Sequence, residues 1–171
     1  MLDRDTALVF EGSDFGFYGA AYHPSYRPGR WFTVGTMGMI GWGVPCGLGA
    51  KVALPDLQVV VLSGDGSFGF NAMEIDTAVR HGLDLTVVVG VDGVWGIDYH
   101  QQVQLYGKAV STELPPARYD KLAEALGTHD VWLRGQHVTL RPMTESDWNT
   151  LLPWSNDPEV MAFADAGRFK I

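Results

Sequence analysis

Two short apolar runs in the middle of the chain have the pattern of buried strands. The first, Val59-Val60-Val61-Leu62, leads into Gly64-Asp65-Gly66, and the second, residues 85–91, leads into Asp92. Each run is short, continuous and rich in β-branched residues, as in strands that are covered on both faces. We therefore expect two strands of a parallel sheet, each followed by an aspartate.

The residues between these two runs have the pattern of a helix. Residues 71–81 carry apolar side chains at helical spacing, namely Ala72, Ile75, Ala78 and Val79. Asn71 is a candidate N-cap, Glu74 stands at the capping-box position, and Gly82 is a candidate C′ residue. Because such crossovers are right-handed and ligands bind at the carboxyl ends of the strands, we expect the two aspartates to meet at one edge of the sheet.

Strand and helix patterns continue to alternate on both sides of this unit. Residues 7–10 form another apolar strand pattern, and helix patterns occur at residues 43–54 and 119–126. This order predicts an α/β fold with a parallel sheet of five to six strands and helices on both faces. The pattern changes after Leu133, which predicts a domain over residues 1–132 and a short, incomplete C-terminal α+β fragment over residues 133–171.

Composition narrows the possible partners and the compartment. The 171-residue chain has a net charge of −8 and no run rich in Lys or Arg, so we expect no nucleic acid partner. No apolar stretch reaches the length of about 18 residues that a membrane span needs, and the N-terminus has no signal-peptide pattern. Cys46 is the single cysteine, which excludes an internal disulfide and fits a reducing cytoplasm.

Two aspartates beside glycine-rich turns suggest a site for a cation and an anion. Carboxylates can hold a hard cation, and the N–H groups of the turns can hold an anion next to it. Each aspartate could instead have a purely structural role. Asp65 could cap its own loop, and Asp92 could be a turn residue before Gly93.

These residues also resemble a known motif. Gly64-Asp65-Gly66, followed by Val91-Asp92, is similar to the metal–diphosphate motif of thiamine-diphosphate-dependent enzymes, which opens with Gly-Asp-Gly and usually closes with Asn-Asn. The resemblance covers about residues 6–132 and is closest to the diphosphate-binding domain of acetolactate synthase-like 2-oxo acid lyases and decarboxylases. Val91 replaces the first Asn, whereas Asp92 occupies the second, metal-ligand position.

The resemblance implies thiamine diphosphate and magnesium as cofactors. It implies that the metal ligands are the carboxylates of Asp65 and Asp92 and the main-chain carbonyl of Val94. The implied cofactor-binding residues lie in four segments: Gly12, Ser13, Asp14 and Phe15; Met37, Gly38 and Ile40; Asp65, Gly66 and Ser67; Trp95 and Gly96. Ile40 would support the bent form of the cofactor. A plain turn for the first segment and core packing for Met37 are the alternatives.

The resemblance further implies that this chain supplies half of an active site. In the family, a glutamate that protonates the cofactor's pyrimidine lies on a separate pyrimidine-binding domain, usually of the partner subunit, and no segment here resembles that domain. We therefore expect no catalytic residue in this chain, a homo-oligomer or a missing segment that completes the site, and a small 2-oxo acid substrate. The expected function is binding of the magnesium–diphosphate end of thiamine diphosphate in a decarboxylase or carboligase. The alternative is a non-catalytic cofactor-binding fragment.

The last forty residues have a different resemblance. Residues 134–142 alternate like an exposed strand, and residues 133–170 are similar to the opening strand and two helices of GNAT-type acyltransferases. The acyl-coenzyme A loop of that family has no counterpart here, so acyltransferase activity is a third and weaker hypothesis. The tail is expected to be either a truncated GNAT-like fragment or a C-terminal extension that packs on the first domain.

Overall fold

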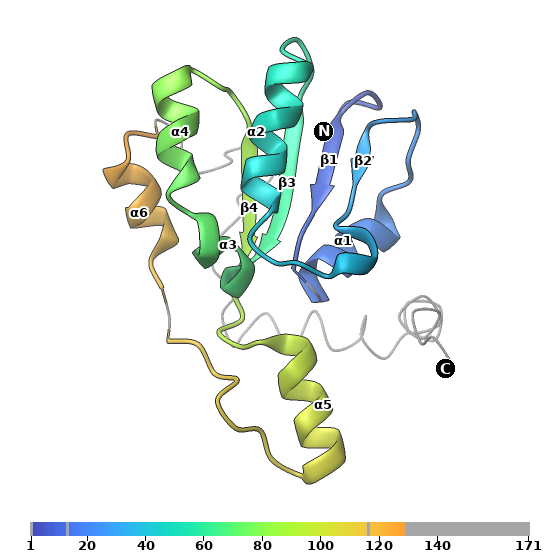
Figure 1. The fold of residues 1–171 in the computed structure, drawn as a ribbon, viewed down its shortest axis with the longest axis vertical. Coiled ribbons are helices and arrows are strands. Elements are labelled where there is room, and N and C mark those ends of the chain that lie inside the picture. Colours follow the sequence, from blue (N-terminus) through green and yellow to red (C-terminus); the bar gives the residue numbers. More distant parts are fainter. Residues whose placement is uncertain (1, 13, 116, 129–171) are drawn as a thin grey trace, which may run out of the picture. The chain divides into compact units, whose positions relative to one another are not determined.

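The computed structural model describes residues 2–12, 14–115 and 117–128. Its four strands form one parallel sheet in the order β2-β1-β3-β4 (Figure 1). The strands are β1 (Ala7–Phe10), β2 (Trp31–Phe32), β3 (Val59–Gly64) and β4 (Thr86–Gly90). The parallel α/β arrangement is confirmed, whereas the predicted fifth and sixth strands are not. The GNAT-like segment predicted after residue 132 lies outside the described residues.

The register of the sheet places the ends of its two longest strands side by side. The β1–β3 pairing runs from Ala7 opposite Val59 to Phe10 opposite Leu62. The β3–β4 pairing ends with Gly64 opposite Gly90. The segments that follow β3 and β4 therefore leave the sheet at the same level, as the two apolar runs predicted.

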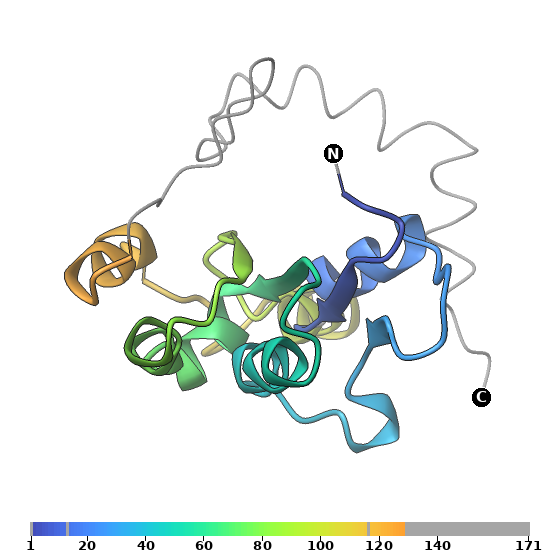
Figure 2. The same ribbon diagram turned by 90° about the horizontal axis from the view of Figure 1, so that it is seen from above.

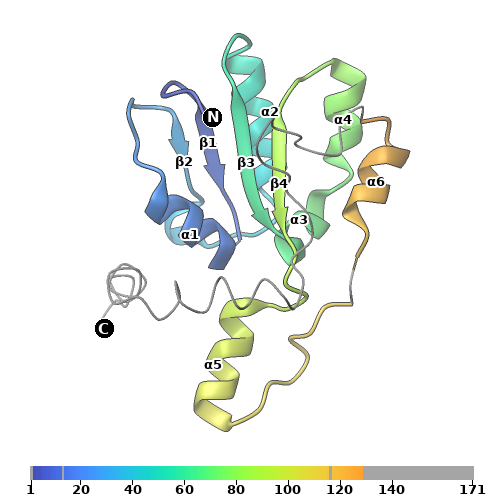
Figure 3. The ribbon, with the colours of Figure 1, turned by 180° about the vertical axis from the view of Figure 1, so that it is seen from behind.

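Helices cover both faces of the sheet (Figures 2 and 3). One face carries α2 (Gly43–Ala53), α3 (Asp65–Asn71) and α4 (Glu74–His81), and the other carries α1 (Asp14–Tyr22). Alternate strand residues separate the two faces. Ala7 and Val59 pack with Ala50 of α2, whereas Leu8, Phe10 and Val60 pack with Ala20 of α1. This burial on both sides explains the apolar pattern of β1 and β3. The prediction of a fully buried strand is wrong for β4, which lies at the edge of the sheet and is only half-buried along its length.

The helix predicted over residues 71–81 is wrong at its beginning. Helix α3 begins at Asp65 and ends at Asn71, and α4 begins separately at Glu74 without a side-chain cap. Asn71 does not cap α4, because its side-chain amide donates a hydrogen bond to the carbonyl of Gly41. The predicted end is confirmed, since Gly82 adopts the left-handed conformation with φ 61°.

Two helices and a short 3₁₀ helix complete the described part of the chain. They are α5 (Gly96–Tyr106), α6 (Tyr119–Ala125) and η1 (Gly35–Met37). Helix α6 contributes Tyr119 and Leu122 to the cluster formed by α2, α3 and α4. Helix α5 begins in the loop after β4 and extends from the carboxyl edge of the sheet (Figure 1). Among the described residues, no helix is long and apolar enough to cross a membrane.

Candidate functional site

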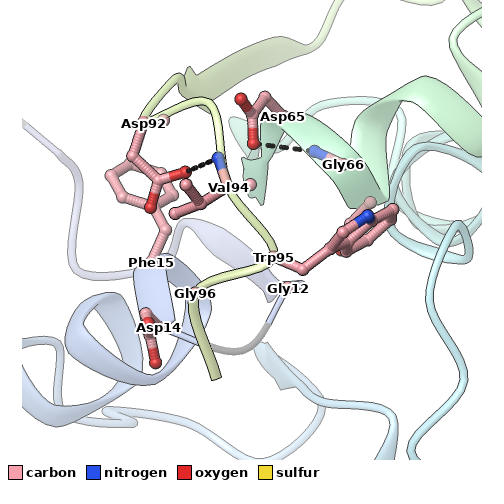
Figure 4. Close-up of a pocket in the computed structure, with 12 residues that line it drawn as sticks. Gly12, Asp14, Phe15, Asp65, Gly66, Asp92, Val94, Trp95 and Gly96 are labelled. Carbon is pink, nitrogen blue, oxygen red and sulfur yellow. Dashed lines mark hydrogen bonds between the residues drawn. The ribbon is translucent and has the colours of Figure 1, made fainter. Parts of the chain in front are cut away.

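A pocket opens at the carboxyl edge of the sheet, where the loops after β1 and β4 meet the start of α3, which follows β3 directly (Figure 4). Its lining residues are Gly12, Asp14, Phe15, Gly64, Asp65, Gly66, Ser67, Gly90, Asp92, Val94, Trp95 and Gly96. The pocket therefore brings together both predicted aspartates and three of the four predicted segments.

Asp65 links the end of β3 to the loop that follows β4. Its side chain is buried, with 5% of the residue exposed. One carboxylate oxygen accepts a hydrogen bond from the Gly66 N–H at 2.8 Å, and the other accepts one from the Gly93 N–H at 3.0 Å. Each oxygen has a second lone pair, so the carboxylate can accept these two bonds and still coordinate a cation.

The main chain of Asp65 is held from a distant part of the sequence. The Tyr119 hydroxyl, at the start of α6, donates a hydrogen bond to the Asp65 carbonyl at 3.0 Å. Burial, followed by the negative charge of Asp65, raises the pKa of Tyr119 above its usual value. Tyr119 therefore stays protonated and remains a donor at neutral pH.

Asp92 organises the loop after β4. It is exposed, and its Oδ1 accepts a hydrogen bond from the Val94 N–H at 3.0 Å. Main-chain hydrogen bonds also join this loop to residues 112–114. The Trp95 N–H donates to the Thr112 carbonyl at 2.7 Å, and the Leu114 N–H donates to the Gly93 carbonyl at 2.7 Å. This network orders the segment that carries Asp92 and the Val94 carbonyl.

The oxygen donors in the pocket fit magnesium by their chemistry. Asp65, Asp92 and Val94 all line it, and magnesium prefers carboxylate and carbonyl oxygens in combination with phosphate. The described part of the chain has no cluster of three or more His, Cys, Asp or Glu side chains that could hold a metal alone. A metal here would thus depend on two carboxylates, a main-chain carbonyl and ligands from a cofactor.

The loop after β1 lies directly against the end of β3 and the start of α3. Gly12 has φ 79°, and a Cβ at this position would lie 2.9 Å from the Gly64 nitrogen and 3.1 Å from the Ser67 hydroxyl oxygen. A larger residue would be strained and would push the two segments apart. Across the pocket, Trp95 covers Gly66 so closely that a Cβ there would lie 2.5 Å from the indole ring.

Asp14 is the third carboxylate of the pocket. It begins α1 and lies against Gly96 at the start of α5, where a Cβ would collide with its carboxylate. Burial raises the pKa of Asp14 above 3.8; the charge of His100 opposes this shift, and that of Asp92 adds to it. The Asp14 side chain therefore contacts the beginning of a second helix, and its contact with a cofactor stays a prediction.

The third predicted segment is not part of this pocket. Met37 and Ile40 are exposed, at 85% and 37%, and neither they nor Gly38 line it. The alternative of core packing for Met37 is wrong. Ser13 lies outside the described residues. Gly64, which opens the predicted motif, also lines the pocket, whereas the sequence interpretation missed Gly90, which lies opposite Gly64 in the β3–β4 register.

Comparisons with known proteins agree with the motif. The family described as "Thiamine pyrophosphate enzyme, C-terminal TPP binding domain" matches residues 13–145. The chain is 43% identical over 154 residues to "Acetolactate synthase large subunit IlvG" of Mycobacterium tuberculosis, covering 90% of this chain and 28% of that protein. It is 36% identical over 132 residues to human "2-hydroxyacyl-CoA lyase 2", covering 77% and 21%. It is also 35% identical over 129 residues to "Sulfoacetaldehyde acetyltransferase" of Alcaligenes xylosoxydans xylosoxydans, covering 73% and 21%.

The extent of these matches matters for the domain assignment. The chain spans about a quarter of the length of the relatives that it matches. The family match ends at residue 145 and so includes the first part of the segment predicted to be a separate tail. The comparisons do not show the GNAT-like resemblance of that tail, which stays a prediction.

The prediction of thiamine diphosphate as the cofactor is confirmed at the level of the family. A match over more than half of the chain and a relative at 43% identity agree with the Gly64-Asp65-Gly66 motif and with the pocket behind it. This chain belongs to the family of C-terminal, thiamine-diphosphate-binding domains of thiamine pyrophosphate enzymes.

Proposed function

We propose that this chain holds the magnesium–diphosphate end of thiamine diphosphate within an acetolactate synthase-like 2-oxo acid decarboxylase or carboligase. The observation that carries the proposal is the pocket in which Asp65 and Asp92 follow neighbouring parallel strands. The Asp65–Gly93 hydrogen bond of 3.0 Å joins the segments that contain them. Ligands of open α/β sheets bind at this edge.

The metal would be held by Asp65, Asp92 and the Val94 carbonyl. Magnesium requires nearly octahedral coordination by oxygen and commonly combines one or two carboxylates with phosphate oxygens and water. Asp65 is buried and held by two N–H groups, whereas Asp92 is exposed. Asp65 is thus the preorganised ligand, and Asp92 completes the site from the solvent side.

The diphosphate would lie among the small residues of the pocket. The main chain at Gly64 is open to an anion, because a Cβ there would have no neighbouring atom within 4 Å, and Ser67 adds a hydroxyl group. Gly12, Gly66 and Gly96 line the same pocket. Asp14 and Phe15 line the same pocket beside the start of α1. Ser13 remains a proposed contact on sequence grounds alone.

The rings of the cofactor would extend toward the glycine-rich segment before α2. Met37 and Ile40 are exposed and apolar, and they are available to pack against a ligand. We propose that Ile40 supports the bent cofactor and that Met37 and Gly38 flank its pyrimidine. Trp95 lies edge-on to Phe70, with ring centroids 6.1 Å apart, and would close the site above Gly66.

When it is bound, thiamine diphosphate supplies the nucleophilic carbon and the electron sink for the reaction. The residues of this chain bind and orient it. We propose that a pyrimidine-binding domain on another segment or on a partner subunit supplies the catalytic glutamate. We also propose that the protein is a homo-oligomer, acts on a small 2-oxo acid and is located in the cytoplasm. The sheet would contain one or two further strands.

Calorimetric titration of the chain with thiamine diphosphate, with and without magnesium, tests the proposal. We expect binding that is at least tenfold tighter with magnesium, and no comparable binding of thiamine, which lacks the diphosphate. Asp84, an exposed residue just before β4, provides a matched control for Asp92, which follows β4. Asp92→Asn should weaken magnesium-dependent binding and Asp84→Asn should not. Equal affinity with and without magnesium would contradict the proposed site.

A further inference from the structure

We propose that Glu11 and Ser63 form a buried clip that positions the loop after β1 against the start of α3, which makes Glu11 a positioning residue for the site. This inference rests on the proposed function, because it concerns the same pocket. Glu11 and Ser63 do not line that pocket themselves. They lie behind it, one residue before Gly12 and one residue before Gly64.

The clip joins the ends of two neighbouring strands. The Ser63 hydroxyl donates a hydrogen bond to Glu11 Oε2 at 2.8 Å, and both residues are buried, with exposures of 0% and 2%. The Glu11 N–H also donates to the Leu62 carbonyl at 2.8 Å. The side-chain bond therefore extends the β1–β3 pairing by one step.

Glu11 is not accounted for by ordinary core packing. Its second carboxylate oxygen, Oε1, is buried and has no hydrogen-bond partner among the described residues. A buried unpaired oxygen is unfavourable, and apolar side chains fill such positions in most cores. A carboxylate at this position therefore points to a role besides stability.

The surroundings of Glu11 connect the clip to a third part of the site. A Cβ at Gly43, the first residue of α2, would lie 2.8 Å from the Glu11 Cβ. Only glycine allows this approach. Helix α2 follows the segment of Met37, Gly38 and Ile40, for which we propose contacts with the cofactor's rings. Glu11 thus touches the helix that begins just after this segment.

The position of Glu11 determines how tightly the pocket closes. Gly12 follows it directly and lies so close to Gly64 and Ser67 that a Cβ would come within 2.9 and 3.1 Å of their atoms. Loss of the clip would allow the loop after β1 to separate from the start of α3. Because the diphosphate would lie between these two segments, separation should weaken its binding.

A second hydrogen bond provides a matched control at the opposite ends of the same strands. The Thr6 hydroxyl, just before β1, donates to Gln58 Oε1, just before β3, at 2.7 Å. Both bonds join side chains 52 residues apart, and Thr6 is also buried, with 4% exposed. The Glu11–Ser63 bond lies at the carboxyl ends of the two strands, and the Thr6–Gln58 bond lies at their amino ends. The pocket lies at the carboxyl ends only.

The test compares Ser63→Ala with Thr6→Val in the full chain. Calorimetry measures the affinity for magnesium with thiamine diphosphate and with inorganic diphosphate, and thermal unfolding measures stability. We expect both variants to unfold at a lower temperature. Only Ser63→Ala should weaken both ligands, by at least fivefold, whereas Thr6→Val should stay within twofold of the parent.

Variants of Glu11 show whether its hydrogen bond to Ser63 or its negative charge determines the affinity. Glu11→Ala should weaken binding as Ser63→Ala does. Glu11→Gln keeps an oxygen that can accept the Ser63 hydroxyl, so it should restore the affinity to within twofold of the parent. If Glu11→Ala fails to fold, the comparison of Ser63→Ala with Thr6→Val still decides the question.

Several outcomes would overturn the clip. They are unchanged affinity in Ser63→Ala, equal losses in Ser63→Ala and Thr6→Val, or a loss in Glu11→Gln as large as in Glu11→Ala. If the parent chain itself binds neither ligand in magnesium, the proposed function fails, and the clip fails with it. Binding by the parent together with unchanged binding by Ser63→Ala would refute the clip alone.

Discussion

Replacement of Asp65 by alanine should affect both stability and cofactor binding. The carboxylate accepts hydrogen bonds from Gly66 and Gly93 at 2.8 and 3.0 Å, and only 5% of the residue is exposed. Loss of each bond at a buried site costs about 1–2 kcal/mol, so the free energy of unfolding should fall by about 2–4 kcal/mol. Loss of the metal ligand should weaken magnesium-dependent binding of thiamine diphosphate at least tenfold, or about 1.4 kcal/mol.

A second variant separates these two effects. Asp65→Asn keeps one side-chain oxygen as an acceptor but loses the charge, so it should lose about half as much stability as Asp65→Ala. Its affinity in magnesium should nevertheless fall at least tenfold. Urea denaturation measures the free energy of unfolding, and calorimetry measures the affinity of each folded variant. If Asp65→Ala and Asp65→Asn both bind the cofactor as tightly as the parent in magnesium, then Asp65 only stabilises the start of α3 and is not a metal ligand.

Three further predictions concern other parts of the chain. Asp14→Asn should increase the free energy of unfolding at neutral pH, because burial raises the pKa of Asp14 in the fold and so disfavours its charged form. Urea denaturation should show that this gain in stability shrinks as the pH falls through the raised pKa of Asp14 and vanishes below the ordinary value of 3.8. A gain in stability that does not depend on pH would contradict the raised pKa. Truncation after Trp132 or after residue 145 should change the free energies of unfolding and of cofactor binding by no more than a few tenths of a kcal/mol. A loss of stability or affinity in the shorter variant alone would extend the domain to the end of the family match. The chain alone should not decarboxylate pyruvate faster than free thiamine diphosphate does in a carbon dioxide release assay, and robust turnover would reveal a catalytic acid within it.

The strands and the two aspartates could be predicted because their signals are local. β-Branched runs form strands that are covered on both faces, and each aspartate directly follows its run. The helix boundary was wrong for an equally local reason. Gly66 and Gly69 have low helix propensity, and the apolar helix pattern begins only after them, yet α3 forms there. Burial of Phe68 against Tyr119 stabilises it, with ring centroids 5.0 Å apart, and this contact joins two residues that are far apart in the sequence.

The remaining features depend on residues that are distant in the sequence. Gly90 is recognisable as a pocket residue only after the strand register places it opposite Gly64 of the motif. The contact between Asp14 and Gly96 likewise requires α1 and α5 to begin beside each other. Ser63 and Glu11 have no motif between them, and their hydrogen bond joins residues 52 positions apart. Local patterns predict elements and motifs, whereas such pairings follow from the packing of the sheet.

A crystal structure of the chain with thiamine diphosphate and manganese would test the central claim most directly. Manganese has nearly the same coordination preference as magnesium, and its anomalous scattering identifies the metal position. We predict one strong anomalous peak coordinated by the carboxylates of Asp65 and Asp92 and the carbonyl of Val94, with the diphosphate beside Gly66 and Ser67. A bound diphosphate whose metal is coordinated by none of these three residues would contradict the proposed site.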